Sequence, residues 1–466
     1  MKEYISPPPL KRQRLTQPVD KAEIPTTDFT PISPPTPGAL RIFSWNINGI
    51  EPFVQPYLQK SIKSFFKPAT NTVKRKRPRD TGSVTSDGEN DEAGGWSKGD
   101  REDPAKEGPA SLRLVLGRYG WPQIFCLQEV KVKPGDSKTM EAIRQAVNDP
   151  IGSNYEPVQS GKSTTASLSD GGPEYKVEFN LPADPYNAKG FGGKVYGVAT
   201  IVRRDFMAEA VQEIREVPWD REGRIQIIET KELSLPLGLL SEPLPTCADS
   251  DDDKEAEELA KSKFAIINIY AVNGTTNPYR STHTGEQVGT RHDRKLAVHS
   301  EILIEAKTLE AKGFHVIIAG DLNVACTKLD GHPKLRTTPY QHVLNRRDFV
   351  QKFFLGQDLD MAPSKAAYNG YEKRLSQAGD IQSFSGVDTF RNRHIFKQRF
   401  SYHPRGVPWG STCDRVDLII TSQSLEDNIL DSGIYDSPRD RGPSDHCPIW
   451  VEIGSRMKSR RDTSEV

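Results

Sequence analysis

The stretch HSEILIEAKTLEAKGFHVIIAGDLN, residues 299–323, joins a helical pattern directly to a strand-like pattern. Its first part, 299–313, places apolar residues on one face of a helix, namely Ile302, Leu303, Ala306 and Leu309. Gly313 follows as the expected end of that helix. The apolar run FHVIIA, 314–319, is typical of a buried strand. A helix and a strand in immediate succession predict a layered α/β or α+β fold.

Other runs of strand character occur on both sides of this stretch. They are RIFSW (41–45), QIFCL (123–127), VYGVATIV (195–202), RIQIIET (224–230), FAIINIY (264–270), RVDLII (415–420) and PIWVEI (448–453). Several of them are apolar throughout, as strands buried in a layered core are. The sequence therefore predicts one large domain rather than several small ones.

The length of the chain overstates the size of this domain. The 466 residues include 36 Gly and 35 Pro, and 27% of them are charged, which is typical of long loops or disordered segments. We expect a disordered tail over 1–38, a domain over 39–455 and a second tail over 456–466. Within the domain, the expected loop insertions lie near 60–110, 160–190 and 234–262.

Composition narrows the range of functions and compartments. The net charge is zero, so a basic surface for a polyanion must be local. We expect no membrane span and no secretory signal, because neither pattern of apolar residues is present. Five scattered cysteines indicate a reducing compartment and show no zinc pattern. Either basic cluster, KRQR (11–14) or KRKRPR (74–79), could be a solvated charge run, but together they favour the nucleus.

Polar residues stand where the predicted strands end. They are Asn46, Asn48, Glu129, Tyr270, Asp321, Asn323, Asp445 and His446. A further carboxylate, Asp417, lies inside the apolar run RVDLII, where it is costly without a partner. Any one of these residues could belong to a turn or a cap. So many of them at strand ends in one domain indicate a site gathered on one rim.

The first part of this set is suited to a metal ion. Carboxylate and amide oxygens without cysteine favour Mg²⁺ or Mn²⁺ over zinc. Because Mg²⁺ keeps several waters, Glu129 with help from Asn48 or Asp445 provides enough protein ligands.

The second part is suited to a phosphate group. Asp321 could orient and deprotonate a water molecule, and His446 could bond a phosphoryl oxygen while Asp417 holds its ring. Asn323 and Tyr270 can donate to phosphate oxygens. Together with a metal ion, these groups predict in-line hydrolysis of a phosphoester.

The segments SWNINGI, CLQEVK, DREGRIQIIE, IYAVNG, AGDLNVA, RVDLII and SDHCPI occur in the order found in a known family. Over about residues 40–455, apart from the insertions, the chain resembles the exonuclease III-like AP endonucleases of the endonuclease/exonuclease/phosphatase superfamily. LQE, GDLN and SDH are shared across that superfamily, whereas WNINGI, DREGR and RVDLII resemble its DNA-repair branch. The resemblance implies a four-layered α/β sandwich, in which two mixed β-sheets pack face to face with helices outside.

The resemblance also implies an activity. It implies Mg²⁺- or Mn²⁺-dependent cleavage of DNA on the 5′ side of an abasic site, as in base excision repair, often with 3′-end trimming. The implied catalytic residues are Tyr270, Asp321, Asn323, Asp417 and His446. The implied metal ligands are Asn48, Glu129 and Asp445, supported by Asn46, with Asp321, Asn323 and His446 as a second metal position. The expected DNA contacts are Lys131, Asn273, Arg280 and Arg391. We expect a monomer that acts on abasic or otherwise damaged DNA.

The chain departs from the family pattern beside the expected abasic pocket. Residues 391–412 are rich in Arg and His, and Asp414 stands where some members carry an aromatic residue. One alternative is therefore the same fold acting as a 3′-exonuclease or phosphodiesterase on other DNA ends or on RNA. A non-catalytic DNA-binding scaffold is a further alternative. It is disfavoured by four intact residues, Glu129, Asp321, Asn323 and His446.

Overall fold

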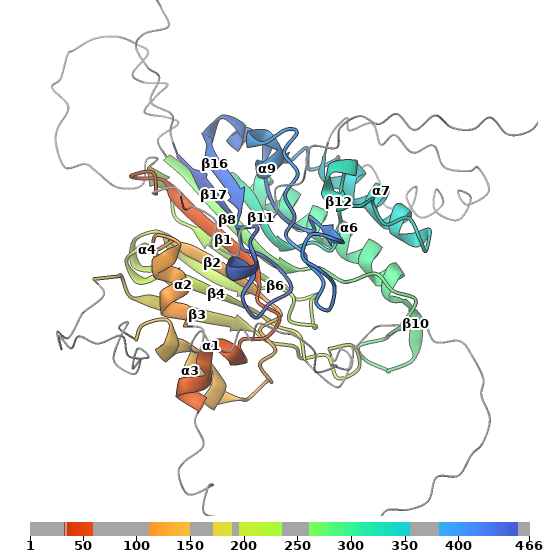
Figure 1. Cartoon of the computed structure of the whole chain (residues 1–466), viewed down its shortest axis with the longest axis horizontal. Helices are drawn as coiled ribbons and strands as arrows, with labels where there is room; N and C mark the ends of the chain where they lie inside the picture. Colours follow the sequence, from red (N-terminus) through yellow and green to blue (C-terminus); the bar gives the residue numbers. More distant parts are fainter. Residues whose placement is uncertain are drawn as a thin grey trace, which may run out of the picture.

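The computed structural model describes residues 32, 35–58, 111–149, 171–188, 195–234, 261–354 and 382–454. In this part of the chain two mixed β-sheets carry helices on their outer sides (Figure 1). The predicted α/β fold is therefore confirmed. Residues 60–110 and 456–466, and nearly all of the predicted tail 1–38, lie outside the described residues.

The first sheet has the strand order β16–β17–β1–β2–β4–β3. Its strands are β1 Leu40–Asn46, β2 Ile124–Gln128, β3 Tyr175–Asn180, β4 Val198–Arg203, β16 Ile429–Ile434 and β17 Ile449–Ile453. β1 and β2 are parallel, and the other pairs are antiparallel. The loop-like interpretation of 160–190 is wrong over Tyr175–Asn180, because YKVEFN pairs with β4 as the edge strand β3.

The second sheet has the order β13–β15–β11–β8–β6–β5, and β7 also pairs with β8. Its strands are β5 Val211–Glu216, β6 Ile225–Thr230, β7 Leu233–Ser234, β8 Lys261–Tyr270, β11 Phe314–Asp321, β13 Val387–Asp388 and β15 Asp417–Thr421. β8 and β11 are parallel. The ends of the expected insertion 234–262 belong to β7 and β8, and 235–260 lie outside the described residues.

Alternation along the strands divides the core into three apolar layers. Ile42 of β1 and Ile317 of β11 belong to one cluster between the two sheets. Their neighbours in sequence point the other way, Phe43 into a cluster with α1–α3 and Ile318 into a cluster with α6 and α7. These strands are apolar throughout because both of their faces are covered. Helices, sheet, sheet and helices thus form the four layers that the sequence predicted.

The remaining elements connect these layers. The helices are α1 Glu51–Leu58, α2 Leu112–Arg118, α3 Ser137–Ala146, α4 Arg204–Glu209, α6 Arg291–Ala311, α7 Gln341–Phe353, α9 Thr389–Arg393 and α10 Pro438–Arg441. Short 3₁₀ turns are η4 Lys328–Asp330 and η6 Gln423–Asn428, and short strands are β9 Pro278–Arg280, β10 Gln287–Thr290, β12 Gly331–His332 and β14 Cys413–Asp414. None of the described helices is both long and apolar enough to cross a bilayer.

The helix predicted over 299–313 is α6, and it begins earlier than predicted. The side chain of Thr290 accepts from the Asp293 backbone, and the Asp293 carboxylate accepts from Thr290 N at 2.9 Å. This reciprocal pair satisfies two backbone donors and starts the helix. At the other end, Gly313 has φ 82°, the left-handed conformation that commonly ends a helix.

A polar layer interrupts the apolar contact between the two sheets. Gln128 Nε2 of β2 donates to Asn268 Oδ1 of β8 at 2.8 Å. Asn268 Nδ2 donates to Thr200 Oγ1 of β4 at 3.1 Å, and Thr200 donates to Gln226 Oε1 of β6 at 2.6 Å. These side chains are buried. The two sheets are therefore joined by directional bonds as well as by apolar packing.

Gly320 lies where β11 runs closest to β8. A Cβ atom there would lie 1.8 Å from the carbonyl oxygen of Ile269, which is backbone and cannot turn away. We expect Gly320→Ala to lower the free energy of unfolding by about 3 kcal/mol, measured by urea denaturation. The control is Gly313→Ala, whose Cβ meets nothing within 4 Å and carries only the left-handed penalty of about 1 kcal/mol. Equal losses in the two variants would contradict the steric argument.

Candidate active site

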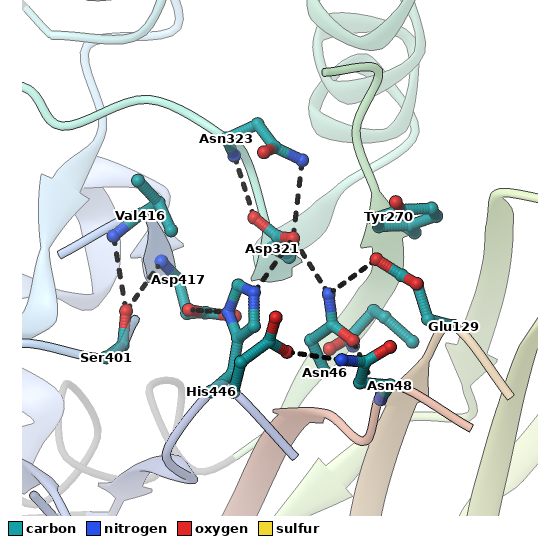
Figure 2. A network of polar contacts seen from close by, with 12 residues as sticks. Asn46, Asn48, Glu129, Tyr270, Asp321, Asn323, Ser401, Val416, Asp417 and His446 are labelled. Carbon is teal, nitrogen blue, oxygen red and sulfur yellow. Dashed lines mark hydrogen bonds and ion pairs between the residues drawn. The ribbon is translucent and has the colours of Figure 1, made fainter. Parts of the chain in front are cut away.

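The ends of strands from both sheets meet at one rim (Figure 2). Parallel pairing of β8 with β11 puts Asp321 opposite Tyr270, and antiparallel pairing of β11 with β15 puts it opposite Asp417. In the other sheet, Asn46 ends β1 and Glu129 follows its parallel neighbour β2. The structure thus brings together the strand-end residues that the sequence pointed out.

Asn46 joins the two halves of this rim. Its Nδ2 donates to Glu129 Oε1 at 3.2 Å and to Asp321 Oδ2 at 3.0 Å, so one amide contacts carboxylates from both sheets. Its Oδ1 accepts from the backbone N of Asn48 at 3.0 Å. The side chain of Asn46 is fully buried, so these bonds have no competition from water.

The side of the rim with the predicted metal ligands holds a lysine ammonium among oxygen atoms. Lys131 Nζ lies 3.0 Å from Glu129 Oε2 and donates to Asn48 Oδ1 as well. Asn48 Nδ2 donates to Asp445 Oδ1 at 2.7 Å. Burial opposes ionisation of Glu129, but Lys131 and hydrogen bonds that include one from Tyr270 hold the pKa of Glu129 below its ordinary value. Lys131, a predicted DNA contact, is therefore engaged inside the site.

Backbone strain marks the same positions. Asn48, Glu129, Lys131 and Asn323 have φ of 50°, 50°, 56° and 53°. Among the described residues only two other non-glycine positions have positive φ. Such conformations are unfavourable for residues with a Cβ and gather at functional sites. Here they turn the chain sharply after β1, β2 and β11, and so leave polar side chains at the rim.

His446 and Asp417 form a buried pair on the other side of the rim. His446 Nδ1 lies 2.8 Å from Asp417 Oδ2, and His446 Nε2 lies 3.9 Å from Asp321 Oδ2. Burial would lower the pKa of His446, but Asp417 and then Asp321 raise it to about 10. Trp45 Nε1 donates to the backbone oxygen of His446 at 2.8 Å and fixes its position. The ring is therefore an imidazolium at neutral pH, with Nε2 directed at the rim.

Asp321 lies between these groups and is 1% exposed. Burial and the neighbouring Asp417 carboxylate raise the pKa of Asp321 to about 7, against the opposing effects of His446 and Asn46. Its Oδ1 accepts from the backbone N of Asn323 at 2.9 Å. A carboxylate with such a pKa can accept a proton efficiently near neutral pH.

Tyr270 is held in place from below by Arg224 of the DREGR segment. The Arg224 guanidinium lies 4.6 Å from the centre of the Tyr270 ring and 4.2 Å from that of Tyr196. Arg224 Nε donates to Glu222 Oε2 at 2.8 Å, and the guanidinium is buried. This arrangement directs the Tyr270 hydroxyl at Glu129, to which it is hydrogen-bonded. DREGR thus supports the site from the interior.

The other three predicted DNA contacts have different positions. Asn273 lines the cleft beside the predicted catalytic residues. Arg280 is exposed on β9, where its Nη1 donates to the Gly285 carbonyl at 3.0 Å. Arg391 in α9 does not line that cleft, and its guanidinium is bound to Asp330 and to the Lys397 carbonyl. This pairing argues against the predicted role of Arg391, because the side chain holds α9 to the chain around Asp330.

Sequence reasoning missed several residues that line the same cleft. They are Lys295, Arg336, His342, Asn345, Arg346 and Tyr402. Lys295 Nζ donates to the carbonyl of Asn323 at 2.7 Å, although the residue is almost fully buried. Its signal in the sequence was its register, because it lies on the same face of α6 as Val298 and Ile302. A lysine in an apolar register needs a buried partner.

The donor atoms at this rim fit a hard divalent cation. Asn48, Glu129 and Asp445 offer oxygen atoms, and the Lys131 ammonium, which contacts Glu129 and Asn48, shows that positive charge is stabilised beside two of them. Ligand atoms of Asp321, Asp417 and His446 form a second group, all within 4.8 Å of one another. In that group His446 Nδ1 is hydrogen-bonded to Asp417, so Nε2 is the His446 atom that remains for a metal ion.

Several solved structures are similar to this chain at low sequence identity. A comparison with curated proteins found no match. Among solved structures, the APE2 catalytic domain of Xenopus laevis is 17% identical to this chain. The match covers 90% of this chain and 94% of the Xenopus chain, with a TM-score of 0.47. An AP endonuclease of Leishmania major is 15% identical, with 92% and 94% covered and a TM-score of 0.46. One of Archaeoglobus fulgidus is 16% identical, with 89% and 99% covered and a TM-score of 0.43.

The family model covers most of the chain. Residues 43–446 match the model of the endonuclease/exonuclease/phosphatase family. This range begins within β1 and ends at His446, just before β17, so it includes the other strands of both sheets and the rim described above. The chain belongs to the endonuclease/exonuclease/phosphatase family of hydrolases.

Proposed function

We propose that this protein is a metal-dependent DNA-repair endonuclease that hydrolyses the phosphodiester 5′ to an abasic site and also processes 3′ ends. The observation that carries the proposal is the contact of Asn46 with both Glu129 and Asp321, which joins a metal side and a phosphate side in one cleft. The segments WNINGI, DREGR and RVDLII, which resemble the DNA-repair branch, support DNA as the substrate.

The residues of the rim divide the reaction between them. Asn48, Glu129 and Asp445 would hold Mg²⁺, which when bound neutralises charge on the phosphate and polarises it. Asp321 takes a proton from the attacking water, because its pKa lies near neutral pH. The imidazolium of His446 donates from Nε2 to a phosphoryl oxygen.

Orientation is the task of the remaining side chains. Asp417 holds the His446 ring through Nδ1. The amide of Asn323, whose Nδ2 donates to the Ala271 carbonyl at 3.1 Å, lies beside Asp321 and can turn to a phosphate oxygen. The Tyr270 hydroxyl donates a hydrogen bond to Glu129 at the edge of the same cleft.

The direct test uses a labelled duplex with one abasic-site analogue, incubated with the full chain in Mg²⁺ and in EDTA. An undamaged duplex and a recessed 3′ end are the companion substrates. We expect metal-dependent incision at the lesion. Trimming of the 3′ end without incision would replace the proposal by the exonuclease alternative, and the absence of any cleavage would overturn both.

Glu129→Ala should raise the Mg²⁺ concentration required for half-maximal rate, because it removes a carboxylate from the proposed metal ligands. We expect a shift of about tenfold or more in a titration of rate against Mg²⁺. Glu141→Ala is the matched control, because that carboxylate is exposed on α3. Superimposable titrations of Glu129→Ala and Glu141→Ala would remove Glu129 from the ligand set.

We also propose that the protein acts in the nucleus as a monomer. The clusters KRQR (11–14) and KRKRPR (74–79) support nuclear import, since both are short runs of Lys and Arg. Replacing the basic residues of both clusters with alanine should move a fluorescent fusion of the full chain out of the nucleus. Unchanged nuclear fluorescence would contradict the assignment of these clusters.

A further inference from the structure

The cleft extends beyond the catalytic residues into a wall of basic side chains. Lys295 comes from α6, His342 and Arg346 come from α7, and Arg336 comes from the segment between β12 and α7. These four residues, named here the basic recess, line the same cleft as Asp321 and Asn323. The mechanism proposed above uses none of the four, so their position beside the reacting centre requires an explanation.

Arg346 is the informative member, because its guanidinium is only partly satisfied. The residue is 7% exposed. Its Nε donates to the Ala325 carbonyl at 2.7 Å and its Nη2 donates to the Arg336 carbonyl at 2.8 Å. Nη1 is buried and has no hydrogen-bond partner among the described residues. A buried charged donor without an acceptor is costly, which points to an acceptor that the substrate supplies.

The charges around Arg346 also favour an anion. Lys295 is 3% exposed, and Arg336 is paired with Asp414 at 3.3 Å. Beyond the carboxylates of the rim, Asp414 is the one acid among the described residues that line the cleft. Burial, then Arg336 and further cations that include Lys295, lower the pKa of His342 to about 4. Burial also lowers the pKa of Lys295 to about 7, so the positive charge of the recess comes mainly from Arg336 and Arg346, and Asp414 leaves it partly uncompensated.

The chemistry of the recess selects among possible occupants. An uncharged sugar leaves Arg346 Nη1 without a strong acceptor and leaves the cations uncompensated. A carboxylate or a phosphate supplies charged oxygen atoms that match a guanidinium. Because the recess is continuous with Asp321, the anion belongs to the same substrate as the reacting phosphate.

We propose that the basic recess is an anion-binding subsite for a carboxylate or phosphate on the fragment that leaves with the scissile phosphate. DNA ends blocked by a short anionic fragment are then better substrates than ends blocked by a neutral one of equal size. The proposal rests on the proposed function, since it takes the group at Asp321 to be a DNA phosphodiester. It adds a specificity that the catalytic residues do not provide.

The test uses three duplexes that differ only at the 3′ end. Each carries a terminal phosphodiester to a two-carbon fragment that ends in a carboxylate, in the neutral amide of that carboxylate, or in a phosphate. For the full chain we expect kcat/KM to be about tenfold higher for the carboxylate than for the amide, as one charge-assisted hydrogen bond would give. The phosphate duplex shows which of the two anions the recess prefers.

Two variants connect this ratio to the recess. Arg336→Gln changes a side chain that is 54% exposed and so leaves the core intact. Arg346→Gln removes the unpartnered nitrogen, and its thermal unfolding is measured to verify that it folds. Both should bring the ratio of carboxylate to amide close to one. Lys307→Gln is the matched control, because Lys307 lies on α6 and pairs with Glu310 away from the cleft, and it should keep the wild-type ratio.

A binding measurement separates this proposal from the proposed function. Calorimetry with free carboxymethyl phosphate, the fragment released from the carboxylate duplex, should show binding to the full chain that Arg336→Gln weakens about tenfold. Binding without cleavage of any duplex would overturn the proposed function and leave the subsite in place. Cleavage with equal kcat/KM for carboxylate and amide, and with no effect of Arg336→Gln on binding, would overturn the subsite and leave the function in place.

Discussion

Asp321→Asn should lower turnover on abasic DNA by roughly 10²-fold or more, the scale of a lost general base. Asparagine keeps the shape of the side chain and can still accept from the backbone N of Asn323, a bond of 2.9 Å in the wild type. It cannot take a proton from water. The measurement is kcat in single-turnover experiments at saturating Mg²⁺, together with the affinity for the duplex, which should change little.

A measurement of the free energy of unfolding distinguishes this loss of turnover from misfolding. Burial raises the pKa of Asp321 to about 7, above its value in the unfolded chain, so its ionisation opposes folding as the pH rises toward 7. A neutral asparagine removes that opposition. The free energy of unfolding of Asp321→Asn at pH 8 should therefore equal or exceed that of the wild type. Near-normal turnover in a folded Asp321→Asn protein would rule out the proposed proton acceptor.

Asp417→Asn should lower turnover by about 10²- to 10³-fold, because it removes the anion that keeps His446 protonated. Asp417 is the largest of the effects that raise the pKa of His446 to about 10. Without that charge the pKa of His446 falls, and Nε2 loses its proton over more of the neutral range. As the pH is raised, kcat should therefore begin to fall at a lower pH than it does in the wild type.

The chain contains its own control for this variant. His299 Nδ1 lies 2.8 Å from Asp348 Oδ2, and both residues are buried between α6 and α7. Asp348→Asn breaks the same kind of pair at the same distance, outside the cleft. We expect it to reduce stability while turnover stays within about twofold of the wild type. Equal losses of turnover in Asp348→Asn and Asp417→Asn would mean that both act through stability alone.

The two Asp–His pairs also show what a sequence leaves open. Burial and nearby lysines lower the pKa of His299 to about 4, in spite of Asp348, whereas two carboxylates raise that of His446 to about 10. Besides burial, the difference comes from Lys295, one turn before His299 on α6, and Lys352 on α7 in one case, and from the distant Asp321 in the other. A motif identifies a pair of side chains, but its charge state depends on the fold around it.

The strands that sequence patterns predicted are those buried on both faces, since a run such as FHVIIA has few other interpretations. The longest of the missed strands, each of six residues, are β3, β5 and β16, which lie at the edges of the two sheets. β5 reads VQEIRE and exposes several side chains, and β16 reads ILDSGI with a register shift in its pairing. Their apolar periods are short and broken, so only pairing with a neighbour defines them.

The rim of polar residues was predictable because its residues follow strands directly, and sheet pairing then brings strand ends together. The recess was not predictable in this way. Arg336 and Arg346 are ten residues apart, and a hydrogen bond from the Arg346 guanidinium to the Arg336 carbonyl joins them. Likewise, nothing in the sequence around Arg391 reveals that Asp330 takes up its charge. Contacts between loops and helices depend on the packing of the whole domain.

The polar layer between the two sheets limits how far one sheet can move relative to the other. Apolar faces tolerate a small sliding of one sheet over the other, because such contacts have no preferred direction. The bonds of Gln128 to Asn268 and of Asn46 to Asp321 cross between the sheets, and because they are directional they oppose such sliding. Neither sheet carries a complete set of the proposed reacting groups, so catalysis requires the two sheets to be correctly aligned. A solvent or temperature that weakened the polar contacts between the sheets would therefore abolish activity while each sheet stayed folded.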